Sequence, residues 1–553
     1  MSIKDNIFAA MYRKYNSVDR RKISLAILIV YCVLIIAGLI FHEQTPDEAK
    51  AWIIARDASF HDMIFLIPKY EGHPPFWHLL LSVPAKLGAD YEISMCIIQF
   101  IGAGLLCFVF EFLTPFNNLA RTFVPFTYFF FYRWGIYQRP YALLAAGLVF
   151  ASYAYGKRRE KPWLFIISLA FMCLWSLYGI VIAGGIAVAW LIEMTYDSAK
   201  SGKGAFSWIT GDRKRLLGLT VLLAFALITI YLMIPAKDNY MYSAVASPGI
   251  LMFFAHAAKV IFFVPAECFI TSFMGTDLLY SYNYSVSESL ICIAVSAVFY
   301  YVLFTAAVRK IKLLYFAVPF LFFMIISSNY IYLHHFGIVL FLAVFYLAVC
   351  KEDKAGKDSD RMIVPKLVSI FSVAAFCMAG MFWSFASLMC DAMYDCASGA
   401  ALASFIKDNN IENLTMDCAW HTQTDDAGSI TVNKPDTGIY AFIISAPYFE
   451  GNHVRNAIDG TAYNLTVEYG EDKIEDHIDK TRKKDAPELL YALNDGLKAN
   501  YVKLIGLKEE YIPVFYSIEA VPCKDKQSFF LGGVLYARSD IASRYGLKEV
   551  KLP

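Results

Sequence analysis

Charged side chains are scarce in this sequence. Asp, Glu, Lys and Arg make up 18% of its 553 residues, whereas soluble domains carry about 25%. Apolar residues reach 58%, and the mean hydropathy is +0.48. Because so much apolar surface needs lipid to face it, the composition excludes a soluble globular enzyme and indicates a protein that crosses a membrane several times.

The sequence also lacks an excess of either charge and any redox or zinc motif. It has 49 basic and 48 acidic residues, so nothing points to nucleic acid as a partner. Its twelve cysteines include no C-x-x-C pair, and no His-rich spacing indicates a zinc site. Four cysteines fall at or after the last apolar segment, in a region that we expect to be extracytoplasmic, where disulfides are permitted: Cys390, Cys396, Cys418 and Cys523.

A signal-peptide cleavage pattern is missing as well. A basic lead with Arg20, Arg21 and Lys22 runs into the apolar stretch 23–41, which is long enough to cross about 30 Å of hydrocarbon. Similar apolar runs follow, so the sequence predicts about eleven transmembrane helices. The further predicted segments are 93–113, 121–136, 140–155, 162–177, 179–195, 216–234, 289–308, 313–328, 335–350 and 364–388.

Basic residues in the short linkers predict the orientation. Four basic clusters share the side of the N-terminus, which the positive-inside rule makes cytoplasmic. If the apolar stretch 250–270 crossed the membrane, the basic cluster at 309–312 would lie on the external side. We therefore interpret this stretch as a re-entrant or interfacial helix in an external loop over 235–288. The clusters lie at 157–161, 213–215, 309–312 and 351–361.

The sequence thus predicts an all-α membrane domain over 1–389, followed by a smaller extracytoplasmic α/β domain over 390–553. The second region is polar and mixed in charge. Some of its segments have apolar residues at helical spacing and others at strand spacing. Its predicted strands are 438–446 and 501–507, and its predicted helices are 400–407 and 487–498.

The first external loop, over 42–92, is amphipathic and predicts short helices along the membrane surface. Near its start are Thr45, Pro46, Asp47 and Glu48, an arrangement typical of a helix capping box. If these residues only cap the helix, their role is purely structural. The alternative interpretation is that the two carboxylates do chemistry at the mouth of the membrane.

Three further segments place ionisable residues on the same external face. Glu71 and His73 precede two prolines, which are typical of a structural turn but would also hold both side chains toward a cavity. Arg139 lies at the start of a predicted span, where it either extends its charge to the interface or binds phosphate. His334 and His335 lie at the outer end of another span.

Together these residues indicate a reaction. Ionisable groups near a membrane are costly and are usually functional. A carboxylate opposed to cations can displace a lipid phosphate with an acceptor hydroxyl, because the carboxylate takes the proton while Arg or His offsets the charge on the departing phosphate.

The motifs that carry these residues together resemble those of a known class of enzymes. The segments 47–52, 71–78, 139–143 and 334–337 resemble the GT-C class of polyprenyl-phosphate-sugar glycosyltransferases. Within it they are similar to the bacterial branch of protein mannosyltransferases and the aminoarabinose transferase of lipid A. The resemblance covers about residues 20–350, and the region after 390 matches no motif.

This resemblance implies roles for individual residues. Asp47 is the expected catalytic base, and Glu48 accompanies it. The phosphate of the donor would bind to Arg139, His334, His335 and His73. Some relatives bind a divalent metal, whose ligands here would be Glu71, His73 and His334. Where mannosyltransferases carry an arginine-tyrosine signature, this sequence has the histidine pair.

We therefore expect an inverting glycosyltransferase in the cell membrane, with a polyprenyl-phosphate sugar donor and a lipid, glycan or protein acceptor on the extracytoplasmic side. Two alternatives stay open: a transporter or flippase of lipid-linked saccharides, and a polymerase or ligase of surface polysaccharide. Against transport, the predicted spans contain no paired broken helices and few ionisable residues near mid-membrane, where transport sites lie.

Overall fold

The structure is a computed structural model of the chain. It describes residues 14–202, 204–211, 213–236, 249–274, 278–354, 363–395, 397–418, 422–424, 430–432, 443–449, 454–456, 486–493, 509–521 and 528–553.

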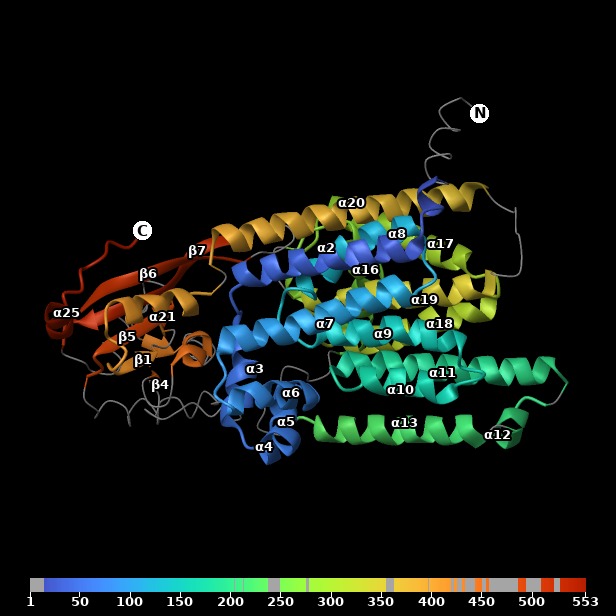
Figure 1. Ribbon diagram of the computed structural model, residues 1–553, viewed down its shortest axis with the longest axis horizontal. Coiled ribbons are helices and arrows are strands. Elements are labelled where there is room, and N and C mark those ends of the chain that lie inside the picture. Colours follow the sequence, from blue (N-terminus) through green and yellow to red (C-terminus); the bar gives the residue numbers. More distant parts are fainter. Residues whose placement is uncertain are drawn as a thin grey trace, which may run out of the picture.

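A bundle of apolar helices forms the larger part of the molecule, and a smaller region with a sheet lies at one end of it (Figure 1). Within the described residues, nine helical segments are long and apolar enough to cross a membrane, and two shorter apolar helices accompany them. The chain is a multi-pass membrane protein, because the outer helices expose apolar side chains that only lipid accommodates. The predicted fold class, helical membrane region followed by a smaller α/β region, is confirmed.

Ten of the eleven predicted spans coincide with helices of the bundle. The most buried of these is α19, whose side chains are apolar on all sides, as expected for a helix at the centre of a bundle. The bundle comprises α2 (Arg20–Phe41), α7 (Tyr91–Leu113), α9 (Tyr141–Gly156), α10 (Pro162–Met172), α11 (Leu177–Lys200), α12 (Ser207–Gly211), α13 (Arg213–Leu232), α15 (Ile250–Phe262), α16 (Val264–Phe269), α17 (Val286–Ala306), α18 (Leu314–Ser327), α19 (Gly337–Lys354) and α20 (Ile363–Met393).

The remaining prediction, a continuous helix over 121–136, is wrong. The chain here forms three short pieces: α8 (Asn118–Phe123), the 3₁₀-helix η1 (Val124–Phe126) and the π-helix η2 (Phe129–Arg133). Pro125 has no N–H to donate to a preceding turn, which favours a break at this point. A π turn is commonly found at functional sites, and this one leads directly into the site described below.

The segment of α15 and α16 enters and leaves the bundle at the same end. His256 donates from Nδ1 to the carbonyl of Ser328 at 2.8 Å, and the N–H of Leu279 donates to the carbonyl of Ile331 at 3.2 Å. Both acceptors follow the end of α18. Between these points, the carbonyl of Phe262 accepts a bond from Ser296, about half-way along α17. This path agrees with the re-entrant interpretation of 250–270, although by length and composition alone the segment could span.

Four short helices follow α2 at the end of the bundle that faces the sheet (Figure 1). Local signals set their limits: Ser59 accepts the N–H of Asp62 to cap one of them, and Gly72, with φ of 63°, ends another in the left-handed conformation. The predicted short helices of the first loop are therefore present. They are α3 (Pro46–Asp57), α4 (Phe60–Phe65), α5 (Pro68–Glu71) and α6 (Phe76–Lys86).

The smaller region contains a mixed five-stranded sheet in the order β4-β1-β5-β7-β6. β1 pairs parallel with β4 and β5, whereas β7 pairs antiparallel with β5 and β6. β2 and β3 pair antiparallel with each other, apart from this sheet. The elements are α21 (Gly399–Asp408), β1 (Met416–Cys418), β2 (Thr422–Thr424), β3 (Ile430–Val432), η6 (Ala446–Tyr448), β4 (Val454–Asn456), β5 (Leu489–Leu493), β6 (Tyr511–Val521), β7 (Ser528–Arg538) and α25 (Ser539–Tyr545).

Local predictions in this region had mixed outcomes. The helix over 400–407 is confirmed by α21, but the described part of the predicted helix 487–498 is strand β5. A short apolar run that is buried on both faces is compatible with a helix and with a strand. Pairing with neighbouring strands then decides which of the two forms. The described end of the predicted strand 438–446 is helical. The rest of that strand and all of 501–507 lie outside the described residues.

The boundary between the two predicted domains stays a prediction, and so does the loop over 235–288. In the structure, α20 continues to Met393 before the chain enters the sheet region. Of the cysteines with a proposed disulfide role, Cys390 and Cys418 are free thiols. Cys396 and Cys523 lie outside the described residues.

Two carboxyl groups, of which Glu43 is half-buried and Glu519 is buried, join the bundle to the sheet region. Glu43, just after α2, accepts the N–H of Ala397 at 3.3 Å, and Glu519 on β6 accepts the N–H of Ser398 at 2.9 Å. Burial and then the nearby carboxyl of Asp395 raise the pKa of Glu43 to about 8. Burial also raises the pKa of Asp395 and of Glu519. This junction is therefore most stable when Glu43 is protonated.

Glu43→Gln is expected to raise the thermal unfolding midpoint at alkaline pH. The pKa of Glu43 is higher in the folded protein than its usual value of 4.5. The contribution of this carboxyl group to the free energy of unfolding is therefore fully present below pH 4.5 and is lost as the pH rises through about 8. Unfolding of the detergent-solubilised protein should therefore separate the variant from wild type at high pH and not in acid. Glu412→Gln, at an exposed position of the same region, is the control. An equal difference at both pH values would contradict the assignment.

Candidate active site

The start of α3 carries both acidic residues that the sequence singles out. The Glu48 side chain accepts hydrogen bonds from the N–H of Thr45 at 2.7 Å and from its hydroxyl at 2.5 Å, as part of a capping box. The N–H of Gln138 also donates to Glu48, which is fully buried. The capping interpretation therefore holds for Glu48, and it leaves Asp47 as the carboxylate that faces outward.

His42 connects α3 with α20. Its Nε2 lies 3.1 Å from Oε1 of Glu48, and its Nδ1 lies 3.3 Å from Oδ2 of Asp391. Tyr132, on η2, donates to the other oxygen of Asp391 at 2.8 Å. Burial alone would lower the pKa of His42, but the two carboxylates outweigh burial and raise it to about 10. His42 is therefore an imidazolium held between two carboxylates, with none of these three side chains exposed.

Asp47 is paired with Arg139 from the turn before α9. Nη1 of Arg139 lies 2.7 Å from Oδ2 of Asp47, and the side chains keep 16% and 58% of their surface exposed, respectively. Arg139 lowers the pKa of Asp47, so this carboxylate is ionised at neutral pH. Burial alone would lower the pKa of Arg139, but Asp47 raises it. The exposure leaves room for a ligand at the carboxylate.

Two further cations and an imidazole surround this pair. Lys50, Arg133 and His73 all interact electrostatically with Asp47 and help to lower its pKa. Nζ of Lys50 lies 2.6 Å from Oε1 of Glu71, so that this second carboxylate is already engaged by a cation. The open part of the site is consequently positive around one ionised carboxylate.

His73 is a neutral imidazole within this group. Burial, followed by the charge of Arg139, lowers the pKa of His73 to about 4, against the opposing effect of Glu71 and Asp47. Its Nδ1 is buried and has no hydrogen-bond partner within the described part of the chain. A neutral ring with an unused nitrogen is suited to bond a ligand that enters the site.

His334 and His335 approach from the short 3₁₀-helix η5 (Leu333–His335) before α19. The carbonyl of His334 accepts the indole N–H of Trp134 at 2.9 Å, which fixes η5 against the chain that follows the π turn. The ring of Tyr141 lies 5.6 Å from the ring of His334. Both histidines interact electrostatically with Arg139, Arg133 and His73.

Five of the predicted residues therefore converge on one location, at the end of the bundle that carries the sheet. They are Asp47, His73, Arg139, His334 and His335. The two other predicted residues lie behind them, Glu48 in the buried network with His42 and Glu71 in its pair with Lys50.

Sequence reasoning missed several members of the site. Arg133 lies in the segment that we predicted as a membrane helix, and the π turn is what brings it to the site. Tyr141 follows Arg139, whose guanidinium lies 5.4 Å from the centre of its ring. Asp391 lies near the end of α20, and no local pattern in the sequence connects it with His42.

The candidate metal ligands are not grouped. In the part of the chain that the structure describes, no set of three or more His, Cys, Asp or Glu side chains is arranged to hold a metal ion. Of the three predicted ligands, Glu71 contacts Lys50, whereas His334 lies on η5 next to His335.

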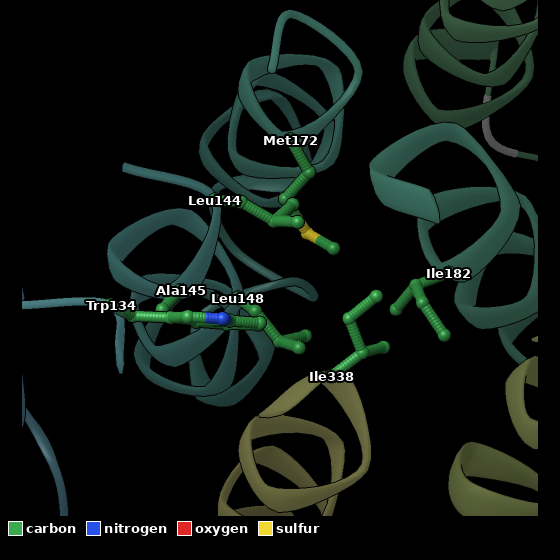
Figure 2. A pocket seen from close by; sticks show the side chains of 7 residues that line it. All are labelled: Trp134, Leu144, Ala145, Leu148, Met172, Ile182 and Ile338. Carbon is green, nitrogen blue, oxygen red and sulfur yellow. The ribbon is translucent and has the colours of Figure 1, made fainter. Parts of the chain in front are cut away.

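A small void lies behind the site, within the bundle. It has a volume of about 10 Å³ and an apolar lining: Trp134, Leu144, Ala145, Leu148, Met172, Ile182 and Ile338. Figure 2 shows these side chains pointing toward one another from different segments. A volume of this size holds about one water molecule at most, so the void is too small for a substrate.

Replacing His42 by Gln is expected to destabilise the protein by about 3–5 kcal/mol, because two buried carboxylates then lose their shared cation. The double variant His42→Gln/Asp391→Asn should lose less than the sum of its single variants. Reversible unfolding in mixed detergent micelles measures both quantities. His61→Gln is the control, since the His61 side chain is 77% exposed. Wild-type stability of His42→Gln would contradict the buried charged network.

No protein-family model and no curated protein matches the chain. Among solved structures, it is similar to ArnT from Cupriavidus metallidurans bound to undecaprenyl phosphate, with a TM-score of 0.49 and 14% identity over 94% of this chain and 98% of that one. It is also similar to the arabinofuranosyltransferase AftD from Mycobacteria, with a TM-score of 0.39 and 11% identity over 94% of this chain and 40% of that one.

Proposed function

We propose that this protein is an inverting glycosyltransferase that moves a sugar from a polyprenyl-phosphate-linked donor to an acceptor hydroxyl. The single observation that carries the proposal is the ion pair of Asp47 with Arg139. A base and a phosphate-binding cation are adjacent in it, and histidines and a second arginine surround them. With the N-terminus in the cytoplasm, as the basic linkers indicate, the reaction takes place on the extracytoplasmic side.

The ion pair couples donor binding to activation of the base. While Arg139 holds Asp47, the lowered pKa makes this carboxylate a weak base. A phosphate group matches the guanidinium of Arg139 with two parallel hydrogen bonds, and it therefore competes with Asp47 for this cation. Release of Asp47 raises its basicity at the moment when the donor is in place.

The chemical step is then a single displacement. Asp47 accepts the proton of the acceptor hydroxyl, and the hydroxyl oxygen forms a bond to the anomeric carbon of the sugar. The bond from that carbon to the phosphate oxygen breaks on the opposite face, with both electrons going to the phosphate. The products are an inverted glycoside and polyprenyl phosphate.

Cations and neutral imidazoles stabilise the leaving phosphate. Arg139 and Arg133 offset its charge, and His73 and His334 supply N–H donors at fixed positions. His335 supports this group from beside His334, because the centres of the two imidazole rings lie 4.0 Å apart. Glu48 acts as a positioning residue in this proposal, because its oxygens already bond Thr45, Gln138 and His42.

Transport of a lipid-linked saccharide is the alternative that a direct assay separates. The purified protein is incubated in detergent with a labelled polyprenyl-phosphate sugar and candidate acceptors. Formation of a glycoside together with polyprenyl phosphate supports the transferase. A donor that is bound but stays intact under all acceptor conditions would favour transport.

Asp47→Asn is expected to reduce the transfer rate by about 10²- to 10⁴-fold, which is the usual contribution of a general base. Donor binding should persist, because Arg139 then no longer shares its charge with a carboxylate. The measurement is turnover of the labelled donor, together with its equilibrium binding. Asp57→Asn is a matched control, since Asp57 also lies on α3 in a 2.7 Å pair with an arginine, Arg56. Wild-type turnover of Asp47→Asn would remove Asp47 from the mechanism.

Arg139→Gln is expected to weaken donor binding by about 10- to 100-fold, because a hydrogen bond to a charged group contributes about 1.5–3 kcal/mol. Arg139→Lys should recover only part of this loss, since an ammonium cannot form two parallel bonds to phosphate. The KM for the donor measures the effect. Arg544→Gln, on α25 of the sheet region, serves as the control. An unchanged KM in Arg139→Gln would show that the phosphate binds elsewhere.

A further inference from the structure

A second polar site lies at the opposite end of the bundle, far from the sheet region. It is a cavity of about 390 Å³ between α11, α12, α13 and the turn after α9. In Figure 1, α12 marks this end, on the side of the bundle away from β1 to β7. The reaction proposed above uses none of its residues.

The cavity wall carries more positive than negative charge among the described residues. Its arginines are Arg158, Arg159 and Arg215, and its carboxylates are Glu193 and Asp197. A cation outside the wall also lies against each carboxylate, Lys312 against Glu193 and Arg309 against Asp197, so the surroundings of the cavity carry a surplus of positive charge.

Each carboxylate is shared between two cations. Glu193 lies 3.0 Å from Arg158 and 2.6 Å from Lys312. Asp197 lies 3.2 Å from Arg159 and 2.9 Å from Arg309. Among the described residues, four cations therefore lie against these two carboxylates. The cavity is consequently suited to an anion.

The neighbours of the cavity residues indicate that the anion is attached to a lipid. Ser207 and Trp208 line the cavity, while Phe206 and Ile209 on either side of them are 66% and 37% exposed. In the same way, Leu217 is 58% exposed two residues after Arg215. Apolar surface thus begins where the basic cavity ends, as it does at the boundary between lipid head groups and acyl chains.

Size and hydrogen-bonding groups agree with a head group. A volume of about 390 Å³ exceeds what a bare phosphate fills and lies within the range of small-ligand sites. Ser198, Ser201 and Ser207 add hydroxyls to the wall, and Trp190 and Trp208 add aromatic faces. Tryptophan is typical of the membrane interface.

We propose that this cavity binds the head group of an anionic phospholipid, at the end of the bundle opposite the active site. The phosphodiester would contact Arg159 and Arg215, the hydroxylated part of the head group would meet the serines, and the acyl chains would lie along α12 and α13. Binding there would anchor α12 and the start of α13 at the membrane surface.

Native mass spectrometry of the full-length protein in detergent tests the proposal. Phosphatidylglycerol and phosphatidylcholine are titrated separately, and the number and affinity of bound molecules are compared. Arg159→Gln/Arg215→Gln should bind phosphatidylglycerol at least about 10-fold more weakly than wild type, because two charge-assisted contacts are lost. The matched control is Arg213→Gln/Lys214→Gln, which removes two charges from the same end without touching the cavity wall.

Three results would overturn the proposal. They are equal phosphatidylglycerol binding by both double variants, equal binding of the two lipids by wild type, and binding of glycerol 3-phosphate as tight as that of phosphatidylglycerol, which would identify a site for a free phosphate. Thermal unfolding verifies that each variant folds. If the double variant does not fold, Arg159→Gln alone is measured, because the Arg159 side chain is 66% exposed and its loss leaves no buried charge.

Discussion

The imidazolium of His42, held between Glu48 and Asp391, is the interaction on which the active end of this protein depends. It joins the first residues of α3 to the last turn of α20, and Tyr132 brings η2 into the same network. Charges buried so completely are stable only when each has its partner, so the relative positions of these elements are strongly restricted. Asp47 precedes Glu48 in the chain, and it therefore faces the open side, where Arg139 lies.

Charged groups are arranged in a similar way at the two ends of the bundle. At each end a buried carboxylate is saturated by cations and hydroxyls, Glu48 near the sheet and Glu193 at the other end. Next to each saturated group is an open site with surplus positive charge, around Arg139 in one case and around Arg159 in the other. The buried groups fix geometry, and in our proposals the open groups bind anions. The proposed sites differ in that the one around Arg139 also has an exposed, ionised carboxylate, Asp47, with the neutral imidazole of His73 beside it.

Much of the architecture could be predicted, because the physical signals for it are local and repeated. The length of the apolar runs predicted the spans, the capping pattern predicted the start of α3, and the polar composition of the last part predicted a smaller region with a sheet. The failures have physical reasons too. Pro125 and the π turn interrupt a run that by composition alone reads as a helix. In β5 a buried apolar run became a strand because β1 and β7 flank it.

By itself the sequence determined that the chain crosses a membrane repeatedly and that Asp47, His73, Arg139 and the two adjacent histidines share one face, since hydropathy and span order depend only on neighbouring residues. Tertiary structure alone decided that Asp47 pairs with Arg139, that Arg133 joins them, that Glu48 is buried against His42 and Asp391, and that a basic cavity forms beside α12. These contacts join residues far apart in the chain. They are fixed by how helices pack and by the cost of burying unpaired charge, which no local pattern of residues encodes.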